Sequence, residues 1–170
     1  TVTAARLPIE PHVSTVMEQW ERERPDLDIT PQAVIARLHR LALRLTDELV
    51  SVYAEHGLGE GEFDVLATLR RQGAPYALTP KELGEQTMVS SGAVTKRVDR
   101  CLAQGWVSRD RRDEDGRGRR VALTERGREL IDAAFTDHIA NEHRLLAVFT
   151  AAERRSLARL LEKWTEQTGA

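Results

Sequence analysis

The chain has 170 residues, of which 41% are hydrophobic and 31% are charged, with one cysteine and a formal net charge of -2 at pH 7. This composition is typical of a folded globular protein, and one cysteine excludes an internal disulfide framework or a multi-cysteine metal site. No apolar run reaches the roughly 18 residues of a membrane span, and the first twenty residues lack the apolar block of a signal peptide, so we expect a cytoplasmic protein without membrane contact.

The N-terminal part of the sequence predicts two helices. The second is long, roughly two dozen residues, with Thr30 as N-cap, Pro31 at the first helical position, a continuous apolar stripe and Gly57 as C-cap. The first is short and must end before Pro25. It is indicated by apolar residues at helical spacing: Val13, Val16, Met17 and Trp20.

The middle of the sequence predicts a helix-turn-helix. A helix is expected around residues 63–69, followed by the segment LTPKELGEQT, in which Thr79 and Glu82 form a capping box at the start of a two-turn helix. After a brief apolar turn, SSGAVTKRVDRC predicts a further helix with Ser90 or Ser91 as its cap. Two helices joined by a short turn, the first of them short, form a helix-turn-helix.

A change of period after this helix predicts a β-hairpin. Two short strand-like runs, at 106–109 and 119–123, flank the polar, glycine-containing segment DRRDEDGRG. A helix-turn-helix followed by such a hairpin is a winged helix. Thr124 then caps a long helix, and a last helix has apolar residues at 157, 160, 161 and 164. The expected fold class is mainly α with a small β wing.

We expect four parts in the chain. These are an N-terminal extension with an extra helix (1–32), a long linking helix (33–56), a winged helix-turn-helix DNA-binding domain (57–123) and C-terminal dimerisation helices (124–170). The helices at both ends of the chain have apolar stripes that the winged-helix core cannot cover. A second copy of the chain is the simplest cover, because most soluble oligomers are symmetric, and we therefore expect a homodimer.

Positive charge is concentrated in one stretch. Residues 96–120 contain nine Lys or Arg and five Asp or Glu, in a chain that is slightly acidic as a whole. A basic surface on an acidic body is typical of a protein that meets phosphate groups on one side. A solvated, charge-rich loop is the alternative explanation for such a run.

The run from helix-turn-helix to wing resembles the MarR family of bacterial transcription regulators over nearly the whole chain. The resemblance rests on VSSGAVTKRVDRCLAQGWVSR, on the wing DEDGRGRRV and on the closing LTERG. It implies a two-fold dimer that places one recognition helix per subunit in successive major grooves of a palindromic operator. It also implies that Arg117 at the wing tip enters a minor groove and that Asp115 orients it. We expect such a protein in the cytoplasm, associated with the nucleoid through its operator DNA.

Helical periodicity separates two neighbouring cations of the expected recognition helix. Lys96 points away from the apolar face of Val94 and Val98, whereas Arg97 lies only about 40° from Cys101, at the margin of that face. We therefore assign Lys96 to DNA and Arg97 to a ligand pocket behind the helix. The expected DNA contacts are Ser90, Ser91, Thr95, Lys96, Arg100, Asp115, Arg117 and Arg119.

A narrower resemblance is to the urate-responsive branch of this family. The resemblance implies that a tryptophan and a first arginine hold an anionic purine, that an aspartate responds to its charge, and that a second arginine links the pocket to the recognition helix. An apolar wall with one acid and two cations suits a flat anion. The expected ligand relieves repression. The matching residues are Trp20, Asp64, Arg97 and Arg109.

Several alternatives stay open. Each of the four ligand residues has an ordinary structural explanation when it is taken alone, and Ala42 stands where some urate-responsive relatives have a dimer-pivot histidine, with His39 one turn earlier. Related branch members respond to other purines or to small polycarboxylates. Cys101 is a candidate redox sensor, although its place on the apolar face favours inert burial. A non-specific nucleoid-associated protein would share the basic face.

The sequence does not indicate an enzyme. The five histidines include no pair at i, i+3 or i+4 spacing, and no nucleophile elbow, P-loop or dinucleotide fingerprint occurs. We therefore expect no catalytic residues, no metal and no cofactor. The expected partners are palindromic double-stranded DNA, a second copy of the chain and a small anionic effector such as urate.

Overall fold

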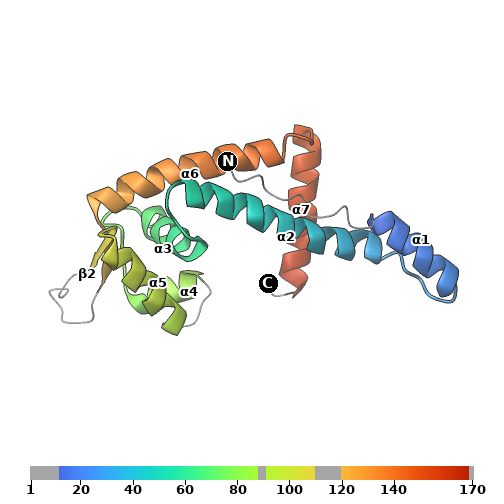
Figure 1. Cartoon of the computed structure of the whole chain (residues 1–170), viewed down its shortest axis with the longest axis horizontal. Helices are drawn as coiled ribbons and strands as arrows, with labels where there is room; N and C mark the ends of the chain where they lie inside the picture. Colours follow the sequence, from blue (N-terminus) through green and yellow to red (C-terminus); the bar gives the residue numbers. More distant parts are fainter. Residues whose placement is uncertain (1–11, 88–90, 110–119, 169–170) are drawn as a thin grey trace, which may run out of the picture. The chain divides into compact units, whose positions relative to one another are not determined.

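The computed structural model describes residues 12–87, 91–109 and 120–168 (Figure 1). The chain divides into two compact units, residues 1–48 and 49–170. The boundary falls within helix α2, Gln32–Glu55. This helix has 24 residues, which confirms the long helix predicted from the apolar stripe.

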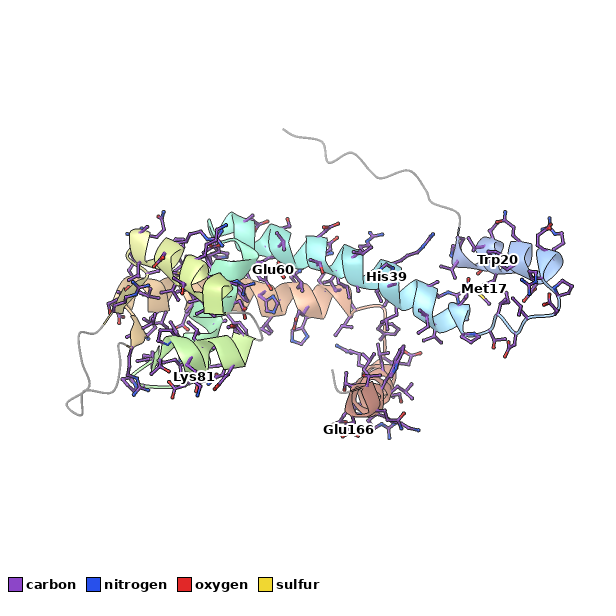
Figure 2. The ribbon with its side chains drawn as sticks, turned by 90° about the horizontal axis from the view of Figure 1, so that it is seen from below. Met17, Trp20, His39, Glu60, Lys81 and Glu166 are labelled. Atoms are coloured by element: carbon purple, nitrogen blue, oxygen red, sulfur yellow. The ribbon has the colours of Figure 1, made fainter. Side chains whose placement is uncertain are left out.

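The first unit contains α1 (Val13–Glu23) and the first two thirds of α2. Met17 and Trp20 lie on α1 (Figure 2). The segment that follows α1 is held by local hydrogen bonds, since the Thr30 hydroxyl donates to Asp28 Oδ1 at 2.7 Å. Helix α2 begins at Gln32, one residue later than predicted.

The second unit contains the predicted helix-turn-helix. Its helices are α3 (Glu60–Arg71), α4 (Pro80–Thr87), α5 (Ser91–Ala103), α6 (Glu125–Leu145) and α7 (Ala151–Thr168). Gly57 closes α2 with a φ of 70°, as expected of a C-cap. The capping box at the start of α4 is confirmed, because Thr79 N donates to Glu82 Oε2 at 2.8 Å and Glu82 N donates to Thr79 Oγ1 at 3.2 Å.

A small antiparallel sheet contains strands from both sides of α5 in the chain. Strands β2 (Val107–Arg109) and β3 (Val121–Leu123) pair as the predicted hairpin. A third strand, β1 (Ala77–Leu78), pairs with β3 on its other side, so the order is β1-β3-β2. The sequence did not predict β1, because two residues are too few to show an alternating pattern.

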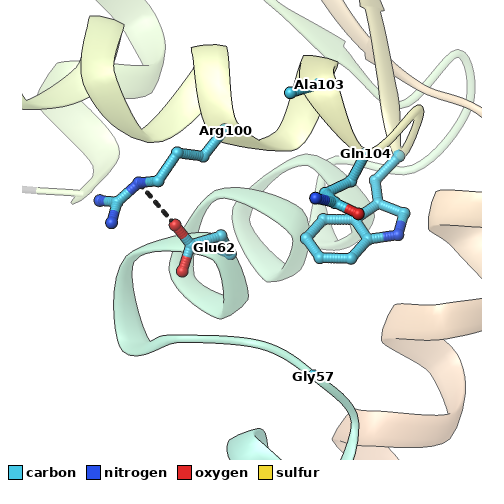
Figure 3. A pocket seen from close by; sticks show the side chains of 6 residues that line it. Gly57, Glu62, Arg100, Ala103 and Gln104 are labelled. Atoms are coloured by element: carbon cyan, nitrogen blue, oxygen red, sulfur yellow. Dashed lines mark ion pairs between the residues drawn. The ribbon is translucent and has the colours of Figure 1, made fainter.

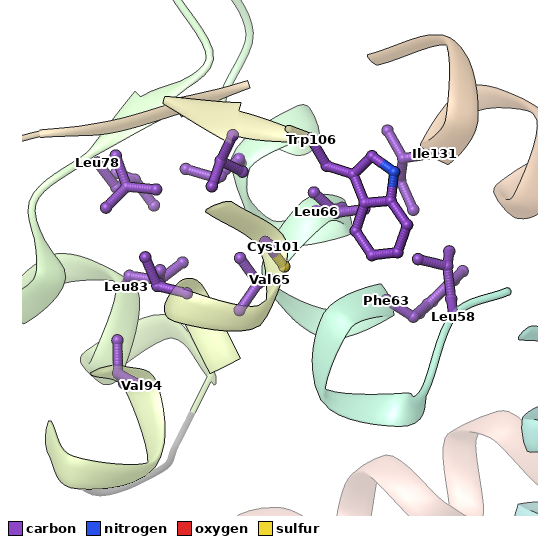
Figure 4. Close-up of a cluster of buried hydrophobic side chains, with 14 of the residues drawn as sticks. Leu58, Phe63, Val65, Leu66, Leu78, Leu83, Val94, Cys101, Trp106 and Ile131 are labelled. Carbon is purple, nitrogen blue, oxygen red and sulfur yellow. The ribbon is translucent and has the colours of Figure 1, made fainter. Parts of the chain in front are cut away.

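One hydrophobic core unites α3, α4, α5, α6 and the sheet (Figure 4). Helix α3 lies at its centre and packs against α4, α5 and α6. Ile131 and Ala134 place the first half of α6 in this same core. The side chains with the least exposure are Leu66, Leu69, Leu83, Cys101, Ile131 and Ala134.

The segment between α5 and β2 lies very close to the start of α6. Thr124 caps α6, since Gly127 N donates to its Oγ1 at 3.0 Å, and the Thr124 hydroxyl also donates to the carbonyl oxygen of Trp106 at 3.0 Å. Gly127 is buried, and a Cβ there would overlap the carbonyl oxygen of Trp106 and lie 2.8 Å from its carbonyl carbon. Backbone atoms cannot move aside as a flexible side chain can.

We therefore expect Gly127→Ala to lower the free energy of unfolding by about 3 kcal/mol or more, because the new methyl group must push the backbone at Trp106 away from α6. Gly92→Ala is the matched control, since Gly92 is exposed on α5 and a Cβ there meets nothing within 4 Å. It should leave stability unchanged or raise it by up to about 1 kcal/mol. Guanidinium unfolding followed by circular dichroism measures both, and equal midpoints for the two variants would contradict the close contact.

Candidate nucleic-acid interface and effector site

Helix α5 has two distinct faces. Val94, Val98 and Cys101 are buried in the core, whereas Lys96 and Asp99 are exposed. Since α5 packs on both α3 and α4, its orientation is determined by its apolar side chains. This arrangement confirms the helical faces predicted from the sequence and leaves a polar face available to a partner.

The two adjacent cations of α5 have different environments. Arg97 Nη1 donates to Asp64 Oδ2 on α3 at 2.6 Å, and both side chains are partly buried. Lys96 is exposed, and no ion pair joins it to another residue in the described part of the chain. Lys96 is therefore available to an anionic partner, while Arg97 is engaged behind the helix.

The negative charge of the Asp64 carboxylate is only partly stabilised by its surroundings. Burial raises the pKa of Asp64 above its ordinary value, although the charge and hydrogen bond of Arg97 act in the opposite direction. The charged carboxylate therefore depends on Arg97, and any ligand that occupies Arg97 leaves this acid in an unfavourable environment.

Close approach of Arg97 to α3 requires Gly61, which the sequence analysis did not single out. A Cβ at this position would lie 3.0 Å from both Cγ and Nε of Arg97. Gly61 therefore makes room for the arginine that pairs with Asp64 one turn later. Gly61 lies in the first turn of α3, two residues after the N-cap Gly59, where a glycine gives no separate signal of such a contact.

A second acid of α3 meets a second arginine of α5, and this pair was also missed. Arg100 Nε lies 2.8 Å from Glu62 Oε1. Glu62 is 8% exposed, and with Arg100 and Trp106 it lines a surface pocket of about 420 Å³ (Figure 3). A glutamate beside Phe63 gives no sequence signal of burial, because its exposure depends on how α3 and α5 cross.

Arg109 ties the wing to the recognition helix. It is the last residue of β2, and its Nη2 donates to Asp99 Oδ1 on α5 at 2.7 Å. Arg97 and Asp99 project from different sides of α5, so Arg109 and the Asp64–Arg97 pair do not form one cluster. The fourth predicted ligand residue, Trp20, lies on α1 in the first unit and is 46% exposed (Figure 2).

The predicted DNA contacts are only partly within the described residues. Thr95, Lys96 and Arg100 are exposed on α5, and Ser91 is the first residue of this helix. The predicted contacts that lie outside the described residues are Ser90, Asp115, Arg117 and Arg119.

The base of the wing is joined to the first helix of the helix-turn-helix. Arg120 Nη2 donates to the carbonyl oxygen of Ala77 at 3.2 Å and lies 4.0 Å from Glu82 Oε2, in the capping box of α4. This contact links β3 with β1 and with the start of α4. The position of the wing strands is thus coupled to the helices that present α5.

In the described part of the chain, no group of three or more His, Cys, Asp or Glu side chains could hold a metal ion. None of the described helices combines the length and apolar character needed to cross a membrane.

Comparisons with known proteins identify the family and the fold of the chain. A sequence model of the MarR family matches residues 56–118. The HTH-type transcriptional regulator PecS of Dickeya dadantii is 39% identical over 149 residues, which cover 88% of this chain and 90% of PecS. A MarR family transcriptional regulator from Streptomyces coelicolor superposes with a TM-score of 0.70 at 25% identity, over 84% of this chain and 97% of that chain.

A second similar structure contains bound DNA. A mutant MarR from Escherichia coli, solved in complex with operator DNA, superposes with a TM-score of 0.67 at 27% identity and covers 81% of this chain and 98% of that chain. These relatives are transcriptional regulators and not enzymes, and their fold is the predicted winged helix-turn-helix.

The environment of Cys101 makes its thiol unreactive. Burial, together with the nearby Glu62 carboxylate, raises the pKa of Cys101 to about 12. At pH 8 the thiolate fraction is therefore on the order of 1 in 10,000, and the side chain is fully enclosed. We expect native protein to react with a disulfide thiol reagent at pH 8 only as fast as it unfolds, and denatured protein to react within seconds. Rapid titration of one thiol in the native state would contradict this expectation.

Proposed function

Since the chain belongs to the MarR family of DNA-binding transcriptional regulators, we propose that it is a repressor whose homodimer binds a palindromic operator and releases it when a small anionic ligand, urate or a related purine, is bound. The observation that carries the proposal is the different state of two neighbouring cations on α5. Lys96 is exposed, whereas Arg97 is held by Asp64. One helix thus has one cation for DNA and another for an effector.

Competition for Arg97 supplies the proposed mechanism of release. A flat anion binds a guanidinium through two parallel hydrogen bonds, which would replace the bond from Arg97 Nη1 to Asp64 Oδ2. Asp64 would then lose its partner, and its charged carboxylate would be disfavoured both by repulsion from the anion and by partial burial. A ligand that binds better when α5 has moved relative to α3 shifts the population toward that state. Displacement of α5 changes the surface presented to DNA.

The two other predicted effector residues have supporting roles in this proposal. Trp20 would give the purine an aromatic face, and its partial exposure leaves it accessible. Arg109 would transmit the change through Asp99, to which it is bonded on the recognition helix. A small polycarboxylate would compete for the same arginine and is the alternative effector.

Exposed apolar side chains support the proposed homodimer. None of the residues of α7 is buried within one chain, although this helix carries an apolar stripe. Exposed apolar surface of this extent on one chain is typical of a protein interface. The exposed large apolar residues of α2, α6 and α7 are Val34, Ile35, Leu38, Leu41, Leu43, Phe135, Ile139, Leu157, Leu160 and Leu161.

In the proposed complex, each subunit reads one half of the operator. Thr95 and Lys96 of α5 would enter the major groove with Ser90 and Ser91, and Arg100 would contact the DNA beside them, while Arg117 and Arg119, oriented by Asp115, would reach the minor groove. The alternatives predict different behaviour. A redox regulator needs a reactive Cys101, which its burial opposes, and a non-specific nucleoid protein would bind random and selected DNA equally well.

The effector proposal is tested by titration with urate. We expect urate to quench the fluorescence of wild-type protein and to release a palindromic duplex that the protein has selected from a randomised DNA pool. Trp20→Phe should lose most of the fluorescence change and require about 10-fold more urate for release, because the phenyl ring offers less surface for stacking. Xanthine and citrate are the comparison ligands. If none of the three alters fluorescence or DNA binding, the effector proposal is wrong, whereas selection of a palindrome would still support the regulator.

The separate roles of Lys96 in DNA binding and of Arg97 in effector binding are tested by substituting each with an uncharged residue. Lys96→Gln should weaken binding to the selected duplex by about 10-fold or more and leave the urate response intact, because a groove contact contributes about 1–3 kcal/mol. Arg97→Gln should keep duplex binding within about 3-fold and abolish release by urate, because the anion loses its bidentate partner. Both are measured by fluorescence anisotropy of labelled duplex, and identical effects of the two substitutions would contradict the division.

A further inference from the structure

A buried glutamate on α3 lies beneath the guanidinium of Arg100. Glu62 is 8% exposed, and its Oε1 lies 2.8 Å from Arg100 Nε. The Arg100 side chain is 55% exposed. Figure 3 shows the terminal nitrogens of Arg100 directed away from Glu62, so that only Nε faces the carboxylate.

The carboxylate of Glu62 is itself held in place by α3. Glu62 lies in the first turn of this helix, where the unpaired N–H groups favour a negative charge. Gly59 is the N-cap of α3, and a Cβ at this position would overlap Glu62 Oε2. The absence of a side chain on Gly59 thus lets the carboxylate fold back over the start of α3.

Charge, and not hydrogen-bond alignment, holds Arg100 to this carboxylate. Glu62 Oε1 has no aligned hydrogen-bond donor within the described residues, although Arg100 Nε is at ion-pair distance. The contact therefore lies at Nε and does not use the two Nη groups. These two groups form the fork that binds a phosphate through parallel hydrogen bonds.

We propose that Glu62 is a positioning residue for DNA binding, which holds Arg100 by Nε so that both Nη groups face a phosphate of the DNA backbone. The proposal rests on the proposed function insofar as α5 is the helix that meets DNA. A held arginine loses less side-chain freedom when it binds, which offsets the partial neutralisation of its charge. In this proposal two acids of α3 act on different arginines: Glu62 positions Arg100 for DNA, and Asp64 holds Arg97, which binds the effector.

We expect substitution of Glu62 to change the affinity for DNA in the direction opposite to the one that its charge alone predicts. Glu62→Gln removes one negative charge, which by itself would strengthen binding to DNA. Loss of the orientation of Arg100 should instead weaken binding by about 3- to 10-fold and reduce the salt dependence, log Kd against log salt concentration, by about 0.9, the value for one phosphate contact. Glu60→Gln is the matched control, because Glu60 is an exposed acid on the same helix. It should leave binding unchanged or slightly stronger, with the wild-type salt dependence.

Substitutions of Arg100 distinguish positioning from a structural role. Arg100→Gln should give the same loss as Glu62→Gln, and the double substitution should equal either single one, because both act on one phosphate contact. Arg100→Lys keeps the charge and removes the fork, so it should bind DNA more weakly than wild type but keep more of the salt dependence than Arg100→Gln. This variant tests the proposal even if Glu62→Gln does not fold.

The measurement is anisotropy of labelled DNA over a series of salt concentrations, with the selected palindrome and with a random duplex. A phosphate contact predicts the same loss on both duplexes. Tighter binding by Glu62→Gln, an additional loss in the Arg100→Gln background, an unchanged salt dependence, or wild-type binding by Arg100→Lys would each overturn the positioning role. If wild-type protein binds both duplexes equally, the proposed operator recognition fails, while the salt dependence of the variants still decides the role of Glu62.

Discussion

The packing of α5 against α3 determines which cations of the recognition helix are available to other molecules. Apolar side chains bury one face of α5, and Gly61 leaves room on α3 for the side chain of Arg97. Two acids of α3 then meet two arginines of α5, Asp64 with Arg97 and Glu62 with Arg100. A change in this packing alters both contacts together, which gives one helix pair control over the charge presented on the polar face.

Much of the fold could be predicted because its elements follow local rules. The capping box of α4 and the C-cap at Gly57 are short-range patterns, and the structure confirms both. The faces of α5 follow from helical periodicity alone. Strand β1 could not be predicted, since its two residues become a strand only by pairing with β3, which lies more than forty residues later in the chain. The start of α2 was displaced by one residue because the Thr30 hydroxyl donates to Asp28.

The candidate site was less predictable, because its contacts join residues far apart in the sequence. Periodicity placed Arg97 at the edge of the buried face, but it could not show that Asp64 is its partner across the helix pair. Burial of Glu62 depends on the crossing of α3 and α5 and on the space left by Gly59, neither of which a charge pattern reveals. The same holds for Arg109, whose acceptor is Asp99 and not the acid that the resemblance associates with the pocket.

In the proposed regulator, the residue that contacts DNA and the residue that binds the effector, Lys96 and Arg97, are neighbours on one helix. Neighbouring residues of a helix are separated by about 100°, so their side chains address different environments while their backbone moves as one body. In the proposed mechanism, a ligand that draws Arg97 away from Asp64 also shifts the helix that carries it, and the core residues Val94 and Val98 join that helix to its neighbours. In the proposed mechanism, the effector changes DNA binding by moving a rigid helix, and it needs no contact with Lys96 itself.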